Sequence, residues 1–140
     1  MFLDLEADRA LFESQIEIIV AAIYENERPL AGLSGLLDWR FQGAISKCIR
    51  SGAISGEAGE CAYIPVVKNG KTFRILLTGA GKSPRPGDRS IPPVESLRAL
   101  TKNLAGLKLS SIGISRRDFG NPSEEFFTKH LKGIPVRVTL

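Results

Sequence analysis

The sequence is poor in the side chains that most often build metal sites and disulfide frameworks. It has two cysteines, Cys48 and Cys61, and one histidine, His130, in 140 residues. Two cysteines are too few for a disulfide framework, and His130 has no cysteine or histidine partner at a zinc-ligand spacing. We therefore expect free thiols, no metal site, no cofactor and no catalytic constellation.

Long apolar runs and a strong charge of one sign are also missing. No run reaches the length of a membrane span, and the N-terminus lacks the basic and apolar regions of a signal peptide. The formal net charge is +4, from 19 basic and 15 acidic residues, and this near balance does not indicate nucleic-acid binding. We expect a cytoplasmic protein without membrane contact, folded as one domain over residues 1–140.

What the sequence does contain is an alternation of strand and helix patterns. Residues 15–24 form an apolar run rich in Ile and Val, typical of a central strand buried on both faces. Residues 60–67 and 72–78 read as strands joined by a tight turn at Asn69-Gly70. Further strands are predicted at 2–6, 109–115 and 134–140, and helices at 38–50, at 92–104 and from an Asn121 cap to about residue 132. This pattern predicts an α/β fold of three layers, with a mostly parallel or mixed central sheet and helices on both faces.

Helical spacing also predicts which side chains face the core. In the helix at 38–50 the inward stripe is Leu37, Phe41, Ala44, Ile45 and Cys48. In the helix at 92–104, which Gly106 should end, the inward stripe is Val94, Leu97, Leu100 and Leu104. Residues 25–35, before the first helix, are predicted to be a loop.

Trp39 falls on the side of its helix opposite the inward stripe. With Gly43 and Arg50 it would form one outward strip, which we interpret as a contact surface for a homodimer or for docking to a larger protein. The alternative is that the helix begins later and that Trp39 packs under the preceding loop.

Two glycine-rich loops are the candidate ligand site. The loop at 79–83 resembles a phosphate loop, but Leu76 stands where the motif needs glycine and Pro84 follows where it needs a helix. A weaker anion-binding role at the end of a strand remains open, and the alternative is a turn that needs positive φ. The candidate ligand-binding residues are Gly56, Gly59, Gly79, Gly81 and Lys82.

Charged residues near these loops have plain interpretations. Lys82, Arg85 and Arg89 could join into a basic patch at the sheet edge, or serve only solubility. Glu57 and Glu60 flank the first loop without a nucleophile or base nearby, and we interpret them as solvated carboxylates.

Four segments carry a family resemblance. They read G-A-I-S at 43–46, R-S-G at 50–52, I-S-G-E-A-G-E at 54–60 and F-R-I-L-L-T-G-A-G-K at 73–82. Their order and spacing resemble the N-terminal domain of the leucyl aminopeptidase family, whose fold is similar to that of macro domains. In that family the chemistry resides in a separate C-terminal domain that binds two metal ions through Asp, Glu and Lys side chains.

The resemblance implies a non-catalytic domain, because no residue here matches those metal ligands. It implies that the protein is not an enzyme but an accessory or protein-interaction domain. The alternative is a small-ligand module that binds a nucleotide or ADP-ribose through its glycine-rich loops, as macro domains do. The bulky Trp39, Arg40 and Phe41 are expected to block that approach at the start of their helix.

Overall fold

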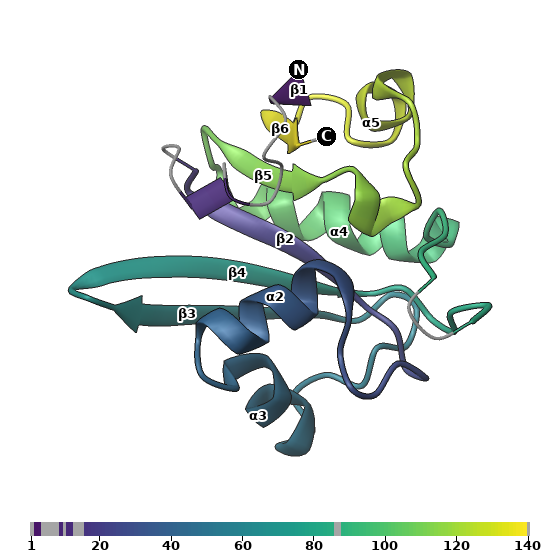
Figure 1. The fold of residues 1–140 in the computed structure, drawn as a ribbon. Coiled ribbons are helices and arrows are strands. Elements are labelled where there is room, and N and C mark those ends of the chain that lie inside the picture. Colours follow the sequence, from purple (N-terminus) through teal and green to yellow (C-terminus); the bar gives the residue numbers. More distant parts are fainter. Residues whose placement is uncertain (1, 4–8, 10, 13–15, 86–87, 140) are drawn as a thin grey trace.

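A six-stranded sheet forms the centre of the protein (Figure 1). The computed structural model describes residues 2–3, 9, 11–12, 16–85 and 88–139. Strand order is β1-β6-β5-β2-β4-β3, and every neighbouring pair is parallel except β3 and β4. The strands are β1 (Phe2–Leu3), β2 (Ile18–Ile23), β3 (Cys61–Lys68), β4 (Lys71–Gly79), β5 (Ile112–Ser115) and β6 (Val136–Thr139). The predicted mixed α/β sheet is confirmed.

Helices cover both faces of this sheet (Figure 1). The helices α2 (Gly32–Arg40) and α3 (Ala44–Arg50) lie on one face; α4 (Val94–Leu107), the short 3-10 helix η1 (Arg117–Phe119) and α5 (Glu124–His130) lie on the other. Ile19 and Ile23 of β2 pack in the first layer, whereas Ile18 and Val20 pack in the second. All six residues of β2 are buried, which confirms a central strand covered on both sides.

The hairpin between β3 and β4 forms as its sequence predicts. Asn69 (φ 52°) and Gly70 (φ 76°) both have positive φ, as a type I′ turn requires, and Lys68 faces Lys71 across the turn. Lys68 and Lys71 form a hydrogen-bonded pair, so the even-numbered residues of β3 direct their backbone N–H and C=O groups toward β4. The odd-numbered residues direct theirs toward the open side. Pro65 therefore lies where a residue would direct its N–H to the open sheet edge, and proline has none.

The single helix predicted at 38–50 is wrong, as is the loop predicted up to residue 35. The chain forms α2 from Gly32 and breaks at Gln42 (φ 56°) and Gly43 (φ 83°), whose left-handed backbone cannot continue an α-helix. Asp38 joins the two pieces, since its carboxylate accepts hydrogen bonds from the Ser46 amide (2.8 Å) and hydroxyl (2.5 Å). The predicted stripe nevertheless faces inward: Leu37, Phe41 and Ile45 are buried, and Ala44 and Cys48 are partly buried.

Three details of the second half also differ from prediction. Val94 is 53% exposed because it is the first residue of α4, next to the Pro93 cap. Gly106 lies inside α4, which ends at Leu107 and is followed by Lys108 in a left-handed conformation. Ser123, and not Asn121, caps α5 by accepting a hydrogen bond from the Phe126 amide.

Two further predictions can be placed only in part. Of the strand predicted at 2–6, residues 2–3 form β1, and residues 4–6 lie outside the described part of the chain. None of the helices in the described ranges has the length and apolar character needed to cross a membrane.

Candidate functional site

The loops that follow the parallel strands meet at the carboxyl ends of these strands, where ligands of open α/β sheets generally bind. The two glycine-rich loops lie there in direct backbone contact. The Gly81 amide donates to the Gly56 carbonyl oxygen at 2.9 Å, and a Cβ added to Gly79 would collide with the Glu57 carbonyl oxygen. Glycine at 79 is therefore required by close packing of the two loops.

The amides of the second glycine-rich loop are already used within the chain. Gly79, Ala80 and Gly81 donate to the carbonyl oxygens of Glu60 (2.8 Å), Ile23 (2.9 Å) and Gly56 (2.9 Å). An anionic ligand at these amides would have to displace backbone hydrogen bonds. This strand end thus has fewer free amide N–H groups for an anion than its glycine content suggests.

The first glycine-rich loop does form an anion cradle, and the anion is Glu60. Its Oε1 accepts hydrogen bonds from the amides of Gly56 (2.9 Å) and Glu57 (2.7 Å) and from the Ser55 hydroxyl (2.6 Å). The hydroxyl bond first, and then the backbone bonds, lower the pKa of Glu60 below its ordinary value, against the opposing effect of burial. Glu60 is partly exposed to solvent, but it is also bound by its own loop, which the sequence did not indicate.

The other predicted ligand residues lie at the surface. A Cβ built on Gly59 would meet nothing within 4 Å, and Lys82 is exposed. The structure therefore brings Gly56, Gly79 and Gly81 together and leaves Gly59 and Lys82 outside that contact. Ligand binding by these five residues remains a prediction.

A buried ionic cluster fills the space beside these loops. Arg89 contacts Glu27 (Nη1 to Oε2, 2.6 Å) and Asp118 (Nε to Oδ1, 3.3 Å, without hydrogen-bond geometry), and its side chain is 8% exposed. Glu27 and Asp118 are 2% and 1% exposed. The guanidinium also lies 4.9 Å from the centre of the Tyr24 ring. Arg89 is thus buried and cannot belong to the surface basic patch that the sequence suggested.

This cluster occupies the N-terminus of α2. The Leu33 amide donates to Asp118 (3.3 Å), the Ala31 amide donates to Glu27 (3.2 Å), and Arg89 fills the position that a Gly32 side chain would take. Helix N-termini are common anion sites, and here two carboxylates of the chain already bind its amides. The small remaining hollow, about 240 Å³, is lined by residues 32, 33, 89, 115, 117 and 118.

The prediction that Trp39, Arg40 and Phe41 stand at the start of their helix is wrong. Trp39, Arg40 and Phe41 lie at the C-terminal end of α2, one helix length from the site. The N-terminus is filled instead by Glu27, Arg89 and Asp118. No sequence pattern marks these three as buried, because charged residues in loops usually serve solubility.

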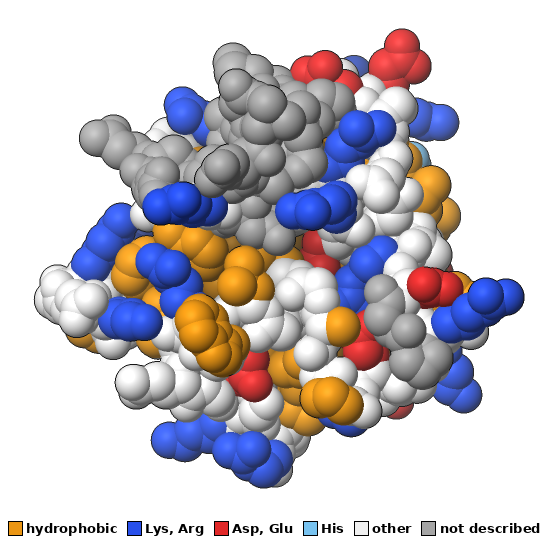
Figure 2. Space-filling model, viewed as in Figure 1, with side chains coloured by type: hydrophobic (Ala, Val, Ile, Leu, Met, Phe, Trp, Pro, Cys, Tyr) orange, Lys and Arg blue, Asp and Glu red, His pale blue; other side chains and the backbone are white. Residues whose placement is uncertain are grey.

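Trp39 is the most exposed large hydrophobic side chain among those described, at 80%. It borders a hollow of about 450 Å³ that Pro29, Leu30 and Gly43 also line. The face over α2 and the β3–β4 hairpin carries further hydrophobic side chains bordered by Lys and Arg (Figure 2). Arg50 does not line this hollow, although Ser46 of the same helix does. The single helix on which the continuous outward strip was predicted is not formed.

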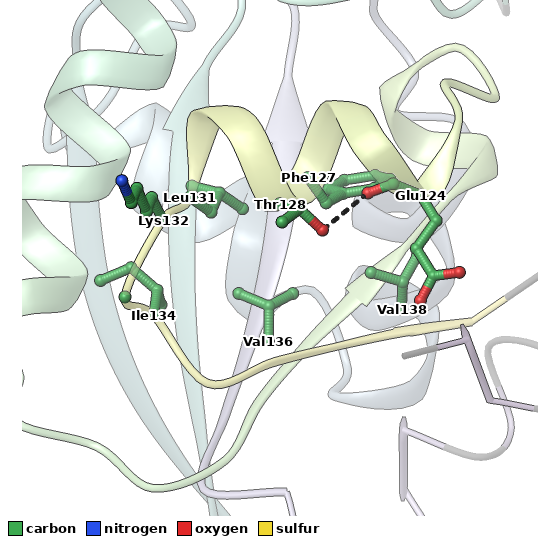
Figure 3. A pocket seen from close by; sticks show the side chains of 9 residues that line it. Glu124, Phe127, Thr128, Leu131, Lys132, Ile134, Val136 and Val138 are labelled. Atoms are coloured by element: carbon green, nitrogen blue, oxygen red, sulfur yellow. Dashed lines mark hydrogen bonds between the residues drawn. The ribbon is translucent and has the colours of Figure 1, made fainter.

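A further hollow of about 200 Å³ separates α5 from β6 (Figure 3). Its lining is mixed: Phe127, Leu131, Val136 and Val138 are apolar, whereas Glu124, Thr128 and Lys132 are polar or charged. The Thr128 hydroxyl donates to the backbone oxygen of Glu124 at 3.2 Å, a bond within α5. In the described ranges no three His, Cys, Asp or Glu side chains are grouped so that they could hold a metal ion.

Comparisons with known proteins agree with this fold. The model of the cytosol aminopeptidase family, N-terminal domain, matches residues 19–127, well over half of the chain. A probable cytosol aminopeptidase of Pseudomonas syringae pv. tomato is 30% identical over 105 residues, which cover 71% of this chain and 21% of that relative. The match thus spans about a fifth of that relative's length.

Solved structures show the macrodomain fold. The macrodomain of Mycobacterium tuberculosis DarG matches with a TM-score of 0.66 at 13% identity, over 99% of this chain and 97% of that one. Thermosipho africanus DarTG in complex with ADP-ribose matches with a TM-score of 0.62 at 12% identity, over 93% of this chain and 39% of that one. Such low identity shows a shared fold and nothing more. By its matched family model, this chain belongs to the cytosol aminopeptidase family, through that family's N-terminal domain.

Proposed function

We propose that this chain is a non-catalytic interaction domain that associates with a second copy of itself through the face around Trp39. The observation that carries this proposal is the exposure of Trp39, 80% of whose surface meets solvent. A tryptophan in water leaves a large apolar area unburied, and tryptophan is enriched at the centres of protein interfaces.

The surroundings of Trp39 suit a symmetric contact. Its indole borders the hollow of about 450 Å³, and Leu36, one turn earlier on α2, is 36% exposed. In a twofold dimer each tryptophan would enter the hollow of its partner, so that one face supplies both halves of the contact. This arrangement would bury the indoles of both copies in one contact.

Two features support a non-catalytic role. The matched family model is that of an N-terminal domain, and the charged groups at the strand ends are held by the chain itself: Glu60 by backbone amides, and Arg89 by two carboxylates. General acid–base chemistry needs a group that can reach a substrate proton. Groups committed to internal bonds serve folding instead.

Analytical ultracentrifugation over a range of concentrations tests the proposal. The wild-type chain should sediment as a dimer, and Trp39→Ala should sediment as a monomer with unchanged circular dichroism. Tyr63→Ala is the matched control, because Tyr63 is also an exposed aromatic residue (47%) but lies on the β3 edge strand; this variant should remain dimeric. Since Trp39 is the single tryptophan, its fluorescence should shift to the red on dilution. A wild-type monomer at every concentration would overturn the proposal.

Small-ligand binding is the second candidate, and the shared fold favours it. A solved relative in fold is a complex with ADP-ribose, and the glycine-rich loops here meet at the equivalent kind of strand edge. Calorimetric titration with ADP-ribose tests it. We expect weak or no binding, because Arg89, Glu27 and Asp118 fill the N-terminus of α2. A dissociation constant in the low micromolar range, about −8 kcal/mol, would make ligand binding the better assignment.

A further inference from the structure

A groove between α4 and α5 combines exposed apolar surface with unpaired positive charge. It has a volume of about 510 Å³ and is lined by residues 94, 97, 98, 101, 102 and 130. Five of these follow one another along a single side of α4 and cover about 12 Å of its length. The groove lies on the face of the sheet opposite α2 and α3, and so it is separate from the Trp39 face.

The wall between the two helices is firmly built. The Thr101 hydroxyl lies within hydrogen-bond distance of two backbone oxygens, that of Leu97 in α4 (2.8 Å) and that of His130 at the end of α5 (3.1 Å), so its one proton is shared between the two helices. The His130 ring lies 4.5 Å from the Phe126 ring, centre to centre. Leu97, 4% exposed, forms the floor, and Val94, 53% exposed, forms an open apolar end.

Positive charge lines this groove without acidic residues among its lining side chains. Arg98 and Lys102 are exposed, lie one helical turn apart, and make no ion pair with any other described residue. The nearest acidic residue along α4 is Glu95, which is exposed and is not part of the lining. A carboxylate-bearing partner would therefore find two cations that the chain does not neutralise.

We propose that this groove binds an acidic segment of another protein that carries an aliphatic side chain. Carboxylates one turn or two strand residues apart would meet Arg98 and Lys102, and the aliphatic side chain would cover Val94 and Leu97. An extended partner fits better than a small anion, because the groove is long and open and its cations are not enclosed. The inference stands whether or not the chain dimerises through Trp39.

Nucleic acid and membrane fit this groove less well. Its one aromatic ring, His130, lies against Phe126, so the groove offers no free surface on which a base could stack. Its apolar part is recessed between helices and consists of two side chains, too few to enter a lipid interface. The arrangement of charge around an apolar floor favours a protein segment.

The test uses fluorescence anisotropy of a labelled peptide of repeated Leu-Glu-Glu units. The wild-type chain should bind it with a dissociation constant below about 1 mM. Arg98→Glu/Lys102→Glu should weaken binding at least about tenfold, or 1.4 kcal/mol. The matched control Lys47→Glu/Arg137→Glu makes the same charge change at exposed positions on α3 and β6 and should bind within about twofold of wild type. Circular dichroism shows whether each variant is folded.

Further probes separate the alternatives. A peptide of Ala-Glu-Glu units should bind more weakly than the leucine peptide, because it lacks the side chain for Val94 and Leu97. Equal losses in the two double variants would show a non-specific charge effect and overturn the proposal. Tighter binding of oligo(dT) or of phosphatidylserine vesicles, lost in the Arg98/Lys102 variant, would assign the groove to nucleic acid or to lipid instead.

Discussion

The carboxylate of Glu60 accepts a hydrogen bond from the amide N–H of Glu57 at 2.7 Å, so the loop between them closes on an anion of its own chain. The sequence motif around it contains two glycines, Gly56 and Gly59, both with positive φ. Glycine permits the backbone to turn its amides inward, which is the geometry of an anion-binding nest. The loop thus has the backbone geometry of an anion-binding site, but its amides bind a carboxylate of the same chain.

Glu60→Gln should destabilise the fold by about 1 kcal/mol at neutral pH, because it removes the charge from hydrogen bonds that remain partly exposed. The folded-state pKa of Glu60 lies below its unfolded value, so its contribution is complete above the unfolded pKa and is lost as the pH falls through the folded one. Urea unfolding should therefore show a difference between wild type and variant that shrinks below about pH 4.5. Glu57→Gln, the adjacent exposed control, should show neither effect. A difference that is constant with pH would contradict this account.

Arg89→Met should destabilise the fold by roughly 3–5 kcal/mol, because it leaves Glu27 and Asp118 buried without their guanidinium partner. Arg85→Met on the same loop is the control, since Arg85 is exposed and should change stability by no more than about 0.5 kcal/mol. Urea midpoints and slopes measure both. A loss below about 1 kcal/mol for Arg89→Met would show that the cluster contributes little to stability.

Pro65→Thr should increase self-association through the sheet edge. β3 is an outer strand of the sheet, and Pro65 has no N–H to donate on its open side. The neighbouring side chains Tyr63 (47%) and Val67 (70%) are exposed. Threonine would restore the donor and favour pairing with another strand. Light scattering should show larger species for this variant than for wild type. The control is the double variant Pro65→Thr/Val67→Lys, whose added edge charge should suppress them.

Thiol labelling should be slow for both cysteines in the folded chain. Burial raises the pKa of Cys48 and of Cys61, and for Cys61 the neighbouring Thr78 hydroxyl partly opposes this effect. A raised pKa lowers the thiolate fraction at neutral pH, so the reaction with a chromogenic disulfide should be slower than for an unfolded chain and should accelerate above about pH 9. Labelling of Cys48 at the rate of the urea-unfolded protein would show that its side of α3 is not packed.

Local patterns were sufficient for most of the architecture. The apolar run around β2, the Asn69-Gly70 turn and the alternation of strands with helices each reflect short-range rules of burial and backbone geometry, and each appears in the fold as predicted. The exposure of Trp39, one of the two interpretations that the sequence left open, also agrees with its predicted position opposite the inward stripe.

Only the tertiary structure decided where the charges lie. Glu27 and Arg89 come from two loops 62 residues apart, and Asp118 comes from η1; each alone resembles an ordinary surface charge. The break at Gln42–Gly43 also appeared only in the structure, where Asp38 of α2 binds Ser46 of α3 across it. The sequence by itself determined the strands and most of the inward-facing side chains, because periodicity is local. The contents of the strand-end site required the structure, because burial of a charge depends on partners that sequence distance does not reveal.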